Sequence, residues 1–438
     1  MAVEFDTNRT VEEIFHRFHL PGINAQYNED YWVWNQVAQG SDPDVRFETS
    51  EFGGTEARFA LEMTRQPGFG PLSDGGALAQ GGTYDVVEAV EQIWEVQQPV
   101  RLTGQSIRLS QSNMGSYARY MNNTVNNATQ AMFQKLCWLM YATPAGALAQ
   151  VDTAATLTNA SDGVEVTFDN VQVDFENFLI DLIGEEFTFV SDPNTSSGSV
   201  AGNGTLVSVT PASGDTRSTT AAFQRVGNTD VSVPDNSYLM YGRYNAAANH
   251  SGFPFGLLHV LDDSVALHGV DPATYPRWKP ISYAAPGTLV ETVLDRALRQ
   301  IKINSGTVDS VCALMDPKAA EDLAHLLLDD KRYVNSAQLG GMGGVNITAL
   351  QAGPWSVPLI TDHFCPPEQA LILSKNELMK FEAVKGIYSL TPPGSGGNWV
   401  HEINNDGSYR DAYQMWMGAG YSIGTKNRNR HALVTNIN

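Results

Sequence analysis

One long amphipathic stretch constrains the fold of this chain more than any other feature. Apolar residues recur at steps of three and four from Met114 to Leu139, and a row of asparagines falls mainly on the opposite side. Thr143 followed by Pro144 prevents continuation. The pattern predicts a single helix over 112–141, a rod of roughly 40 Å at about 1.5 Å per residue. Its amide-rich, nearly uncharged polar face favours contact with other protein.

The residues before this helix, 45–110, are predicted to form a long extended loop. Several pieces alternate polar with apolar residues, as half-buried strands do, among them Ala57–Thr64 and Val100–Leu102. Between them, Pro67–Gly82 reads PGFGPLSDGGALAQGG, and such glycine density excludes both a helix and a packed strand. We therefore expect two strands joined by a long, mobile tip. The pattern GxxxxGK[ST] is missing, so phosphate binding is not predicted.

The stretch 147–245 is rich in short strands and turns. Val164–Phe168 and Val171–Phe175 alternate cleanly, and further short strands follow as far as Tyr238–Tyr241. The linkers, such as Asp192–Gly198, carry residues that are typical of turns. A small barrel or sandwich, inserted into the chain, fits this pattern best.

The last third mixes helices and strands again. A helix from about 288 to 303 precedes a short buried strand, Val311–Met315. Asp316 and Pro317 then supply a cap and a first-turn proline for another helix. Short strands return after it and continue to the C-terminal region. The sequence contains no internal repeat.

The first 44 residues are predicted to be an arm. One short helix, 11–18, precedes an aromatic cluster that includes Tyr31, Trp32 and Trp34. So many aromatic side chains need a partner surface, because an extended arm cannot bury them against itself. Two alternatives stay open: the arm packs on another subunit, or it folds back onto its own core.

Charge and composition exclude several classes of protein. The chain has 27 Lys and Arg against 48 Asp and Glu, a formal charge of −21, and no basic stripe, which argues against a direct nucleic-acid reader. Only 17% of the residues are charged, so much of the surface is expected to lie in contacts. An acidic inner wall that repels enclosed DNA, and an adaptation for solubility or a saline habitat, explain the acidity equally well.

The cysteines and the missing targeting segments indicate where the protein works. Cys137, Cys312 and Cys365 are far apart and odd in number, which is typical of buried thiols in a reducing compartment. The N-terminus lacks the basic region and apolar run of a secretion signal. Nowhere do apolar residues persist for the roughly 18 positions that a membrane span requires. We expect a protein that is made and used in solution, with no membrane contact.

No catalytic, cofactor-binding or metal-binding residue is predicted. The GxSxG, HExxH, Walker and dinucleotide patterns are all missing. His259, Asp262, Asp263 and His268 could together bind a divalent ion, but ordinary turn chemistry explains them better. Trp278 could stack on a sugar, although a proline-flanked aromatic more often anchors a loop to the core.

The order of these parts resembles the HK97-like fold, which tailed-phage major capsid proteins, herpesvirus major capsid proteins and encapsulins share. This α+β fold has an N-terminal arm, an extended β-loop, a long spine helix, and peripheral and axial domains. The segments Gln351–Ile360 and Leu371–Leu373 are similar to part of the axial domain, and Arg428–Ile437 to the C-terminal strand. The corresponding units here are the arm 1–44, the extended loop 45–110 with tip 67–82, the spine helix 111–146, an inserted β-rich domain 147–245, the axial domain 246–375 and the returning peripheral strands 376–438.

The resemblance implies a structural subunit, not an enzyme. Such a subunit self-assembles as pentamers and hexamers into an icosahedral capsid around the double-stranded DNA of a tailed bacteriophage, without sequence-specific binding. It is assembled in the host bacterial cytoplasm and stays in the virion capsid. Some members close the shell with an isopeptide bond from a loop lysine, but the first lysine here is Lys135, so we expect non-covalent closure. The short arm leaves no room for a scaffolding segment, so the expected partners are a separate scaffolding protein, a portal and a decoration protein.

Inter-subunit contacts are expected on the arm and the extended loop. The residues predicted to carry them are Tyr31, Trp32, Trp34, Arg58, Glu62, Arg65, Gly70 and Gly76. Charged pairs there fix register more than they add strength, and each contact can be weak because several hold a subunit at once. Two rival functions remain: an encapsulin-type nanocompartment shell, and a polysaccharide-binding or polysaccharide-active β-rich protein.

Overall fold

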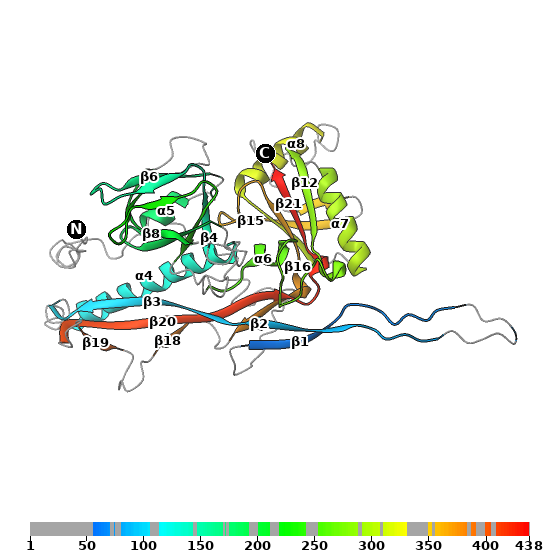
Figure 1. The fold of residues 1–438 in the computed structure, drawn as a ribbon, viewed down its shortest axis with the longest axis horizontal. Coiled ribbons are helices and arrows are strands. Elements are labelled where there is room, and N and C mark those ends of the chain that lie inside the picture. The colour runs from blue at the N-terminus through cyan, green and yellow to red at the C-terminus, as the bar shows by residue number, and fades with distance from the viewer. Residues whose placement is uncertain are drawn as a thin grey trace.

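The alternating segments on either side of the glycine-rich stretch pair with each other. In the computed structural model, β1 (Glu56–Glu62) and β2 (Val86–Gln92) are antiparallel, with Glu56 opposite Gln92 and Glu62 opposite Val86. The chain beyond them projects far from the rest of the molecule, and we call the described part of 56–92 the finger (Figure 1). The residues that the structure describes are 56–70, 74, 80–105, 114–142, 147–169, 171, 175–191, 200–210, 219–241, 253–287, 291–306, 310–330, 349–352, 355–382, 387–390, 399–403 and 409–437.

A long strand, β20 (Tyr409–Thr425), organises the sheet at the base of the molecule. β3 (Trp94–Thr103) runs antiparallel to it, from Thr103 opposite Ala412 to Trp94 opposite Tyr421. Figure 1 shows α4 (Met114–Met140) running along β3 and β20. Three shorter strands also pair with β20: β17 (Leu378–Glu382), β18 (Tyr388–Leu390) and β19 (Val400–Ile403). One sheet and one long helix therefore form an elongated base, and α4 lies where the periodicity predicts a helix.

The β-rich stretch closes into a barrel, one of the two architectures predicted for it. Phe223 inside the barrel meets Phe168, Phe187 and Phe189 edge to face, and all four side chains are fully buried. A short pair, β5 (Ala155–Leu157) and β10 (Val231–Val233), contacts its strands. The barrel order is β11 (Tyr238–Tyr241), β4 (Ala147–Val151), β6 (Val164–Asp169), β9 (Thr219–Arg225), β8 (Val200–Thr210) and β7 (Glu186–Val190), with β7 closing on β11.

A six-stranded sheet forms the third part of the molecule. Its strand order is β12 (Ile281–Gly287), β21 (Ala432–Ile437), β16 (Ala370–Ser374), β13 (Val311–Met315), β15 (Trp355–Thr361) and β14 (Ala349–Ala352). α7 (Glu291–Ser305) packs against β12 and β21, and its apolar face, including Leu294, Leu298 and Ile301, is buried. α8 (Pro317–Asp330) begins at the predicted cap, where an Asp316 carboxylate oxygen accepts the Lys318 amide at 3.1 Å.

The last strand departs from the expected grouping. β21 lies between β12, to which it is parallel, and β16, to which it is antiparallel. It therefore belongs to the six-stranded sheet, whereas the prediction placed all of 376–438 with the strands that return to the long helix. The short 3-10 helix η5 (Arg428–Arg430) separates β20 from β21 and turns the chain from one sheet into the other. The division of the chain into domains otherwise stays a prediction.

Aromatic side chains join the three parts where α4 ends. Trp138 of α4 stacks on Phe178 with ring centroids 4.7 Å apart, and it meets Phe364 edge to face at 5.7 Å. Phe178 belongs to α5 (Phe175–Ile180) beside the barrel, and Phe364 follows β15. Nearby, the Tyr141 hydroxyl donates to the Asp362 carboxylate at 3.0 Å, and burial raises the pKa of this hydroxyl well above its usual range. The end of the helix is thereby fixed to both neighbouring parts.

Several smaller expectations also have an outcome. Phe175, predicted as a strand residue, instead begins α5. Trp278 is buried in the core, as predicted, and the three cysteines are buried and free. Within the described ranges, no helix is both long and apolar enough to cross a membrane. The predicted arm, with Tyr31, Trp32 and Trp34, lies outside the described residues.

Candidate assembly site

The base of the finger is held by a buried polar network. Glu91 on β2 bonds to the His268 Nδ1 at 2.7 Å through one carboxylate oxygen, and its other oxygen accepts the Ser422 hydroxyl of β20. The Thr425 backbone amide donates to His268 Nε2 at 3.2 Å, so the ring proton lies on Nδ1 and points to Glu91. The backbone adds a bond from the Val90 amide to the His268 carbonyl, 2.9 Å long. The finger is thus attached to the body through β2.

Aromatic packing secures β1 on the same side. Phe59 stacks on Phe381 of β17 at 6.0 Å between ring centroids and meets the His268 ring edge to face at 5.1 Å. Ala57 and Phe381 belong to the same small buried cluster. Alternate residues of β1 therefore face the body, while Arg58, Ala60 and Glu62 are exposed.

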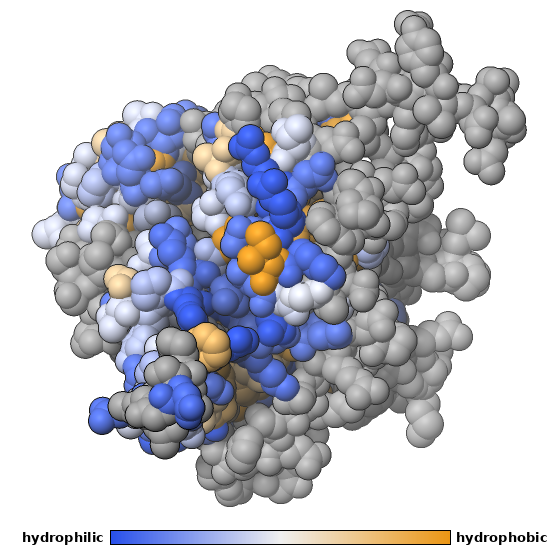
Figure 2. Space-filling view, turned by 90° about the vertical axis from the view of Figure 1, so that its right-hand side faces the viewer, coloured by the Kyte–Doolittle hydropathy of each residue, from blue (hydrophilic) through white to orange (hydrophobic). Residues whose placement is uncertain are grey.

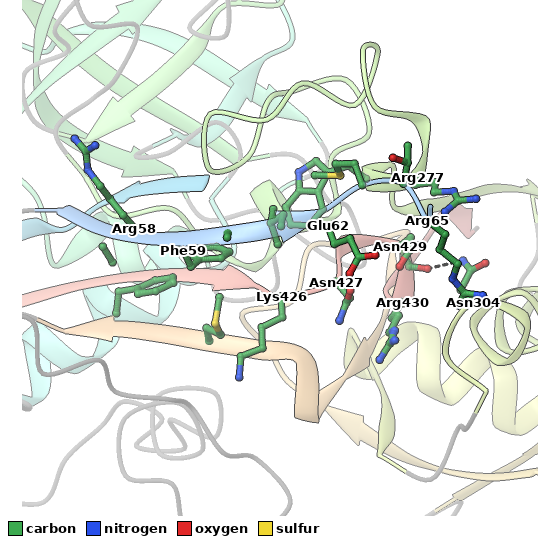
Figure 3. A pocket seen from close by; sticks show the side chains of 18 of the residues that line it. Arg58, Phe59, Glu62, Arg65, Arg277, Asn304, Lys426, Asn427, Asn429 and Arg430 are labelled. Carbon is green, nitrogen blue, oxygen red and sulfur yellow. Dashed lines mark hydrogen bonds between the residues drawn. The ribbon is translucent and has the colours of Figure 1, made fainter. Parts of the chain in front are cut away.

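A groove of about 910 Å³ runs beneath β1. We call it the basal groove. Its floor includes Phe59, Trp278, Met379 and Phe381. Its charged and amide side chains are Arg58, Glu62, Arg65, Arg277, Asn304, Lys426, Asn427, Asn429 and Arg430. Figure 3 shows that Arg58 lies apart at one end, whereas Glu62, Arg65 and Arg277 gather at the other with the residues of η5.

The basal groove is basic in a strongly acidic chain. Five Arg and Lys side chains line it against one carboxylate, that of Glu62, although the chain as a whole has a formal charge of −21. Within the described ranges, neither Arg65 nor Arg277 is held by an ion pair. An exposed apolar side chain, Ile303 at 68% exposure, also lines the groove. Such a surface fits a partner segment that carries carboxylates.

The remaining groove cations are already engaged within the chain. Arg58 bonds to Glu56 at 3.1 Å and to Glu88 across the hairpin at 3.3 Å. The hydrogen bond to Glu56, followed by that to Glu88, raises the pKa of the Arg58 guanidinium, so its charge persists throughout the physiological range. Arg430 forms an ion pair with Glu377.

A buried arginine fixes the loop that supplies the far wall of the groove. Arg428 is fully buried, and its guanidinium donates to the carbonyls of Val260 and Val265, each at 2.8 Å, and of His259 at 3.2 Å. It also donates to the Asp262 carbonyl. Burial lowers the pKa of Arg428 to about 10, and Asp262 partly offsets this effect. The neighbouring groove residues 426–430 are therefore held in place by a satisfied internal charge.

The outer part of the finger presents an aromatic side chain to solvent. The hairpin continues beyond β1 through the bond from the Gly82 amide to the Pro67 carbonyl, 3.2 Å long. Gly68 has a φ of +126°, and a Cβ there would lie 2.7 Å from the Gln80 carbonyl oxygen, so only glycine fits. Phe69 follows and is completely exposed, at 106%.

The predicted contact residues divide into three groups. Arg58, Glu62 and Arg65 all line the basal groove. Gly70 is exposed on the outer finger, next to Phe69. Tyr31, Trp32, Trp34 and Gly76 lie outside the described residues. Their role in subunit contacts stays a prediction.

Sequence reasoning missed two parts of this surface. Phe69 could have been found, since an aromatic residue between two glycines in PGFGP has no local partner to cover it. Arg277, Lys426 and Arg430 carry no local signal, because only the tertiary fold brings them to β1.

The predicted four-residue metal cluster does not form. His268 bonds to Glu91, His259 stacks on Phe255, and Asp263 pairs with Lys279 at 3.0 Å. Asp262 accepts the Ser264 amide at 2.9 Å, as a turn residue does. Among the described side chains, no group of three or more potential metal ligands gathers.

Comparison of the structure with solved structures identifies the fold. The chain is similar to the structure described as the capsid asymmetric unit of cyanophage A-1(L), with a TM-score of 0.55 and 11% identity over 98% of this chain and 99% of that chain. The fold is thus the HK97-like capsid fold, as the sequence resemblance predicts. A scan of protein-family models finds no match, and neither does a search of curated proteins.

Two other structures align along their length at lower TM-scores. One is the capsid of a native GTA particle, with a TM-score of 0.47 and 10% identity over 100% of this chain and 99% of that chain. The other is the holo-SrpI encapsulin complex of Synechococcus elongatus PCC 7942, with a TM-score of 0.38 and 9% identity over 98% and 95%. These values add no weight to the fold assignment.

Proposed function

We propose that this chain is a structural shell subunit that self-assembles, as pentamers and hexamers, into the icosahedral capsid of a tailed bacteriophage. The observation that carries the proposal is the likeness to the cyanophage A-1(L) capsid structure, which spans almost the whole of both chains. A role as a subunit, without catalysis, follows from it. The double-stranded DNA genome would be enclosed without sequence-specific contacts, because the chain is acidic overall.

The finger and the basal groove support assembly from identical copies. The finger leaves the body and has no part of its own body to lie on (Figure 1). The groove holds the Arg65 and Arg277 guanidinium groups without carboxylates. A neighbouring copy of an acidic chain supplies carboxylates, so the groove is a contact between subunits in this proposal.

The proposed partners follow from the same role. A separate scaffolding protein would direct assembly, a portal would occupy one vertex, and a decoration protein is a further candidate partner. Assembly would take place in the cytoplasm of the host bacterium, and the finished protein would reside in the virion.

Negative-stain imaging and sedimentation of the purified protein test the proposal. We expect closed shells or ring-shaped capsomers, and uniform monomers at every concentration would refute it. The genes beside the coding sequence separate the proposal from an encapsulin-type compartment: terminase and portal genes are expected, and a cargo-enzyme gene would favour the compartment.

A further inference from the structure

The exposed phenyl ring of Phe69 requires an explanation. It is more exposed than any other large hydrophobic side chain in the described part of the chain. The face from which the finger projects is otherwise mostly hydrophilic over the described residues, with a few separate hydrophobic patches (Figure 2). An aromatic ring held in water at the end of a rigid hairpin costs free energy that only a partner surface can recover.

The chain carries an apolar pocket at the other end of the molecule. The pocket has a volume of about 230 Å³ and lies between β3 and α4, where Val96, Met132, Leu136 and Leu139 line it together with Phe253. We call it the α4 pocket. A dry apolar cavity of about 150 Å³ is enough to bind benzene, so a phenyl ring fits a space of this size.

The finger cannot reach this pocket within its own chain. Figure 1 shows the finger projecting away from the body on the side opposite the barrel, while the pocket lies by α4 and β3, beneath the barrel. A contact between them must therefore join two copies. Because the two surfaces differ, the contact is heterologous and repeats from copy to copy, which is the geometry that closes rings.

Charge at the two surfaces is complementary. Arg65 precedes Phe69 by four residues, about 13 Å of extended chain, and no ion pair holds it within the described ranges. The pocket has carboxylates at its rim: Glu95 lines it, and Glu185 bonds to two of its lining residues, Lys135 at 3.3 Å and Tyr241 at 2.8 Å. An arginine beside the ring thus meets an acidic rim beside the cavity.

We propose that Phe69 of one subunit inserts into the α4 pocket of a second copy, with Arg65 facing the carboxylates at its rim. This inference rests on the proposed function and names the surfaces that join neighbouring subunits. Gly68 and Gly70 give the backbone the conformation that presents the ring, and the Glu91–His268 network holds the hairpin that carries it.

Assembly measured by light scattering against protein concentration tests the role of the ring. Phe69→Ala should raise the threshold concentration for assembly by about tenfold or more, and Phe69→Leu should lie between it and the unaltered protein. Circular dichroism should show both variants folded, because the ring has no contact to lose within the subunit. Assembly of Phe69→Ala at the unaltered threshold would overturn the proposal.

Engineered disulfides test the location. Phe69→Cys combined with Gln97→Cys, an exposed residue of the α4 pocket, should give a ladder of linked subunits on a non-reducing gel. The matched control is Phe69→Cys with Ile303→Cys, an exposed residue of the basal groove, which should stay unlinked. The three native cysteines are buried and should remain silent.

The outcomes separate this inference from the proposed function. Shells that form normally while the Gln97 pair stays unlinked, or while the Ile303 pair links equally well, refute the Phe69 contact and leave the shell function standing. An unaltered protein that forms neither shells nor rings refutes both.

Discussion

Glu91 on β2 and His268, which follows the short helix α6 (Leu257–Leu261), form a fully buried hydrogen bond of 2.7 Å that ties the finger to the body. Glu91→Ala should leave the His268 N–H and the Ser422 hydroxyl without acceptors. We expect a loss of about 3 kcal/mol in the free energy of unfolding. We also expect faster hydrogen exchange in β1 and β2, measured by mass spectrometry.

Glu91→Gln is the matched control for this change. Its amide oxygen can accept the His268 N–H while its NH₂ donates to the Ser422 oxygen, so both bonds persist and protection should stay close to that of the unaltered protein. An equal rise in exchange over the barrel in Glu91→Ala would show a global loss of stability, contrary to an anchor specific to the finger.

Arg428 is expected to be the most sensitive charged residue of the described chain. Arg428→Met leaves four buried carbonyl oxygens without their donor and should reduce the free energy of unfolding by about 3 kcal/mol or more. Arg430→Met, which removes a partly exposed ion pair with Glu377, should cost less than about 1 kcal/mol. Urea unfolding followed by circular dichroism gives both values. Equal losses would mean that burial of Arg428 has no special role.

Acid should weaken the six-stranded sheet through His431. This ring is fully buried: its Nδ1 accepts the Ser374 amide at 3.1 Å, and its Nε2 lies 2.8 Å from the Thr425 hydroxyl. Burial, followed by the charges of Arg428 and Arg430, lowers the pKa of His431 from 6.5 to about 3. The unfolded chain therefore takes up a proton near pH 6.5 that the folded chain takes up only near pH 3.

The contribution of His431 to stability is complete above pH 6.5 and is lost as the pH falls to about 3, by on the order of 4 kcal/mol. Urea unfolding at several pH values between 7 and 3 measures it. His431→Gln is the control, since it has no group that titrates in this window. If the two pH profiles were parallel, the acid sensitivity would come from other groups.

Assembly should depend more on Arg65 than on Arg58. The double change Arg58→Ala with Arg65→Ala is expected to impair assembly while the subunit stays folded. Arg65 should account for most of the effect, because Glu56 and Glu88 already neutralise Arg58 within the subunit. Light scattering of the two single variants and the double variant measures these shares. Normal shells from the double variant would contradict a role for both residues.

Salt provides an independent measure for the same surface. Replacing Arg65 and Arg277 together by alanine should make the assembly threshold less dependent on ionic strength, because exposed charge pairs are screened at about 10 Å in 0.1 M salt. Light scattering at several salt concentrations measures this dependence. An unchanged salt dependence would show that the basal groove does not meet carboxylates of a neighbour.

Local patterns were sufficient to predict elements whose residues interact with near neighbours in sequence. The helix periodicity before Pro144 predicts α4, and Val311–Met315 was predicted with the bounds that β13 has. The alternation in Val171–Phe175 misled, because Phe175, Phe178 and Leu179 follow helical spacing and bury one face of α5.

Long-range relationships could not be predicted from such patterns. Nothing near β21 indicates that it lies beside β12, because the strand order of a sheet is set by tertiary packing. The candidate site shows the same division: Arg58, Glu62 and Arg65 came from one strand, whereas Arg277 and Arg430 reach the groove from distant segments. Phe69 was overlooked because the glycines around it were read only as a mobile tip.

The pairing of β3 with β20 sets a schedule for folding during synthesis. Thr103 must wait for Ala412, about 300 residues later, and at about 5–20 residues per second this takes roughly 15–60 s on the ribosome. During that interval β3 is an unpaired strand edge, open to other nascent chains. The cell must therefore shield this strand until translation is almost finished, so the yield of usable protein should depend on chaperones and on the speed of translation.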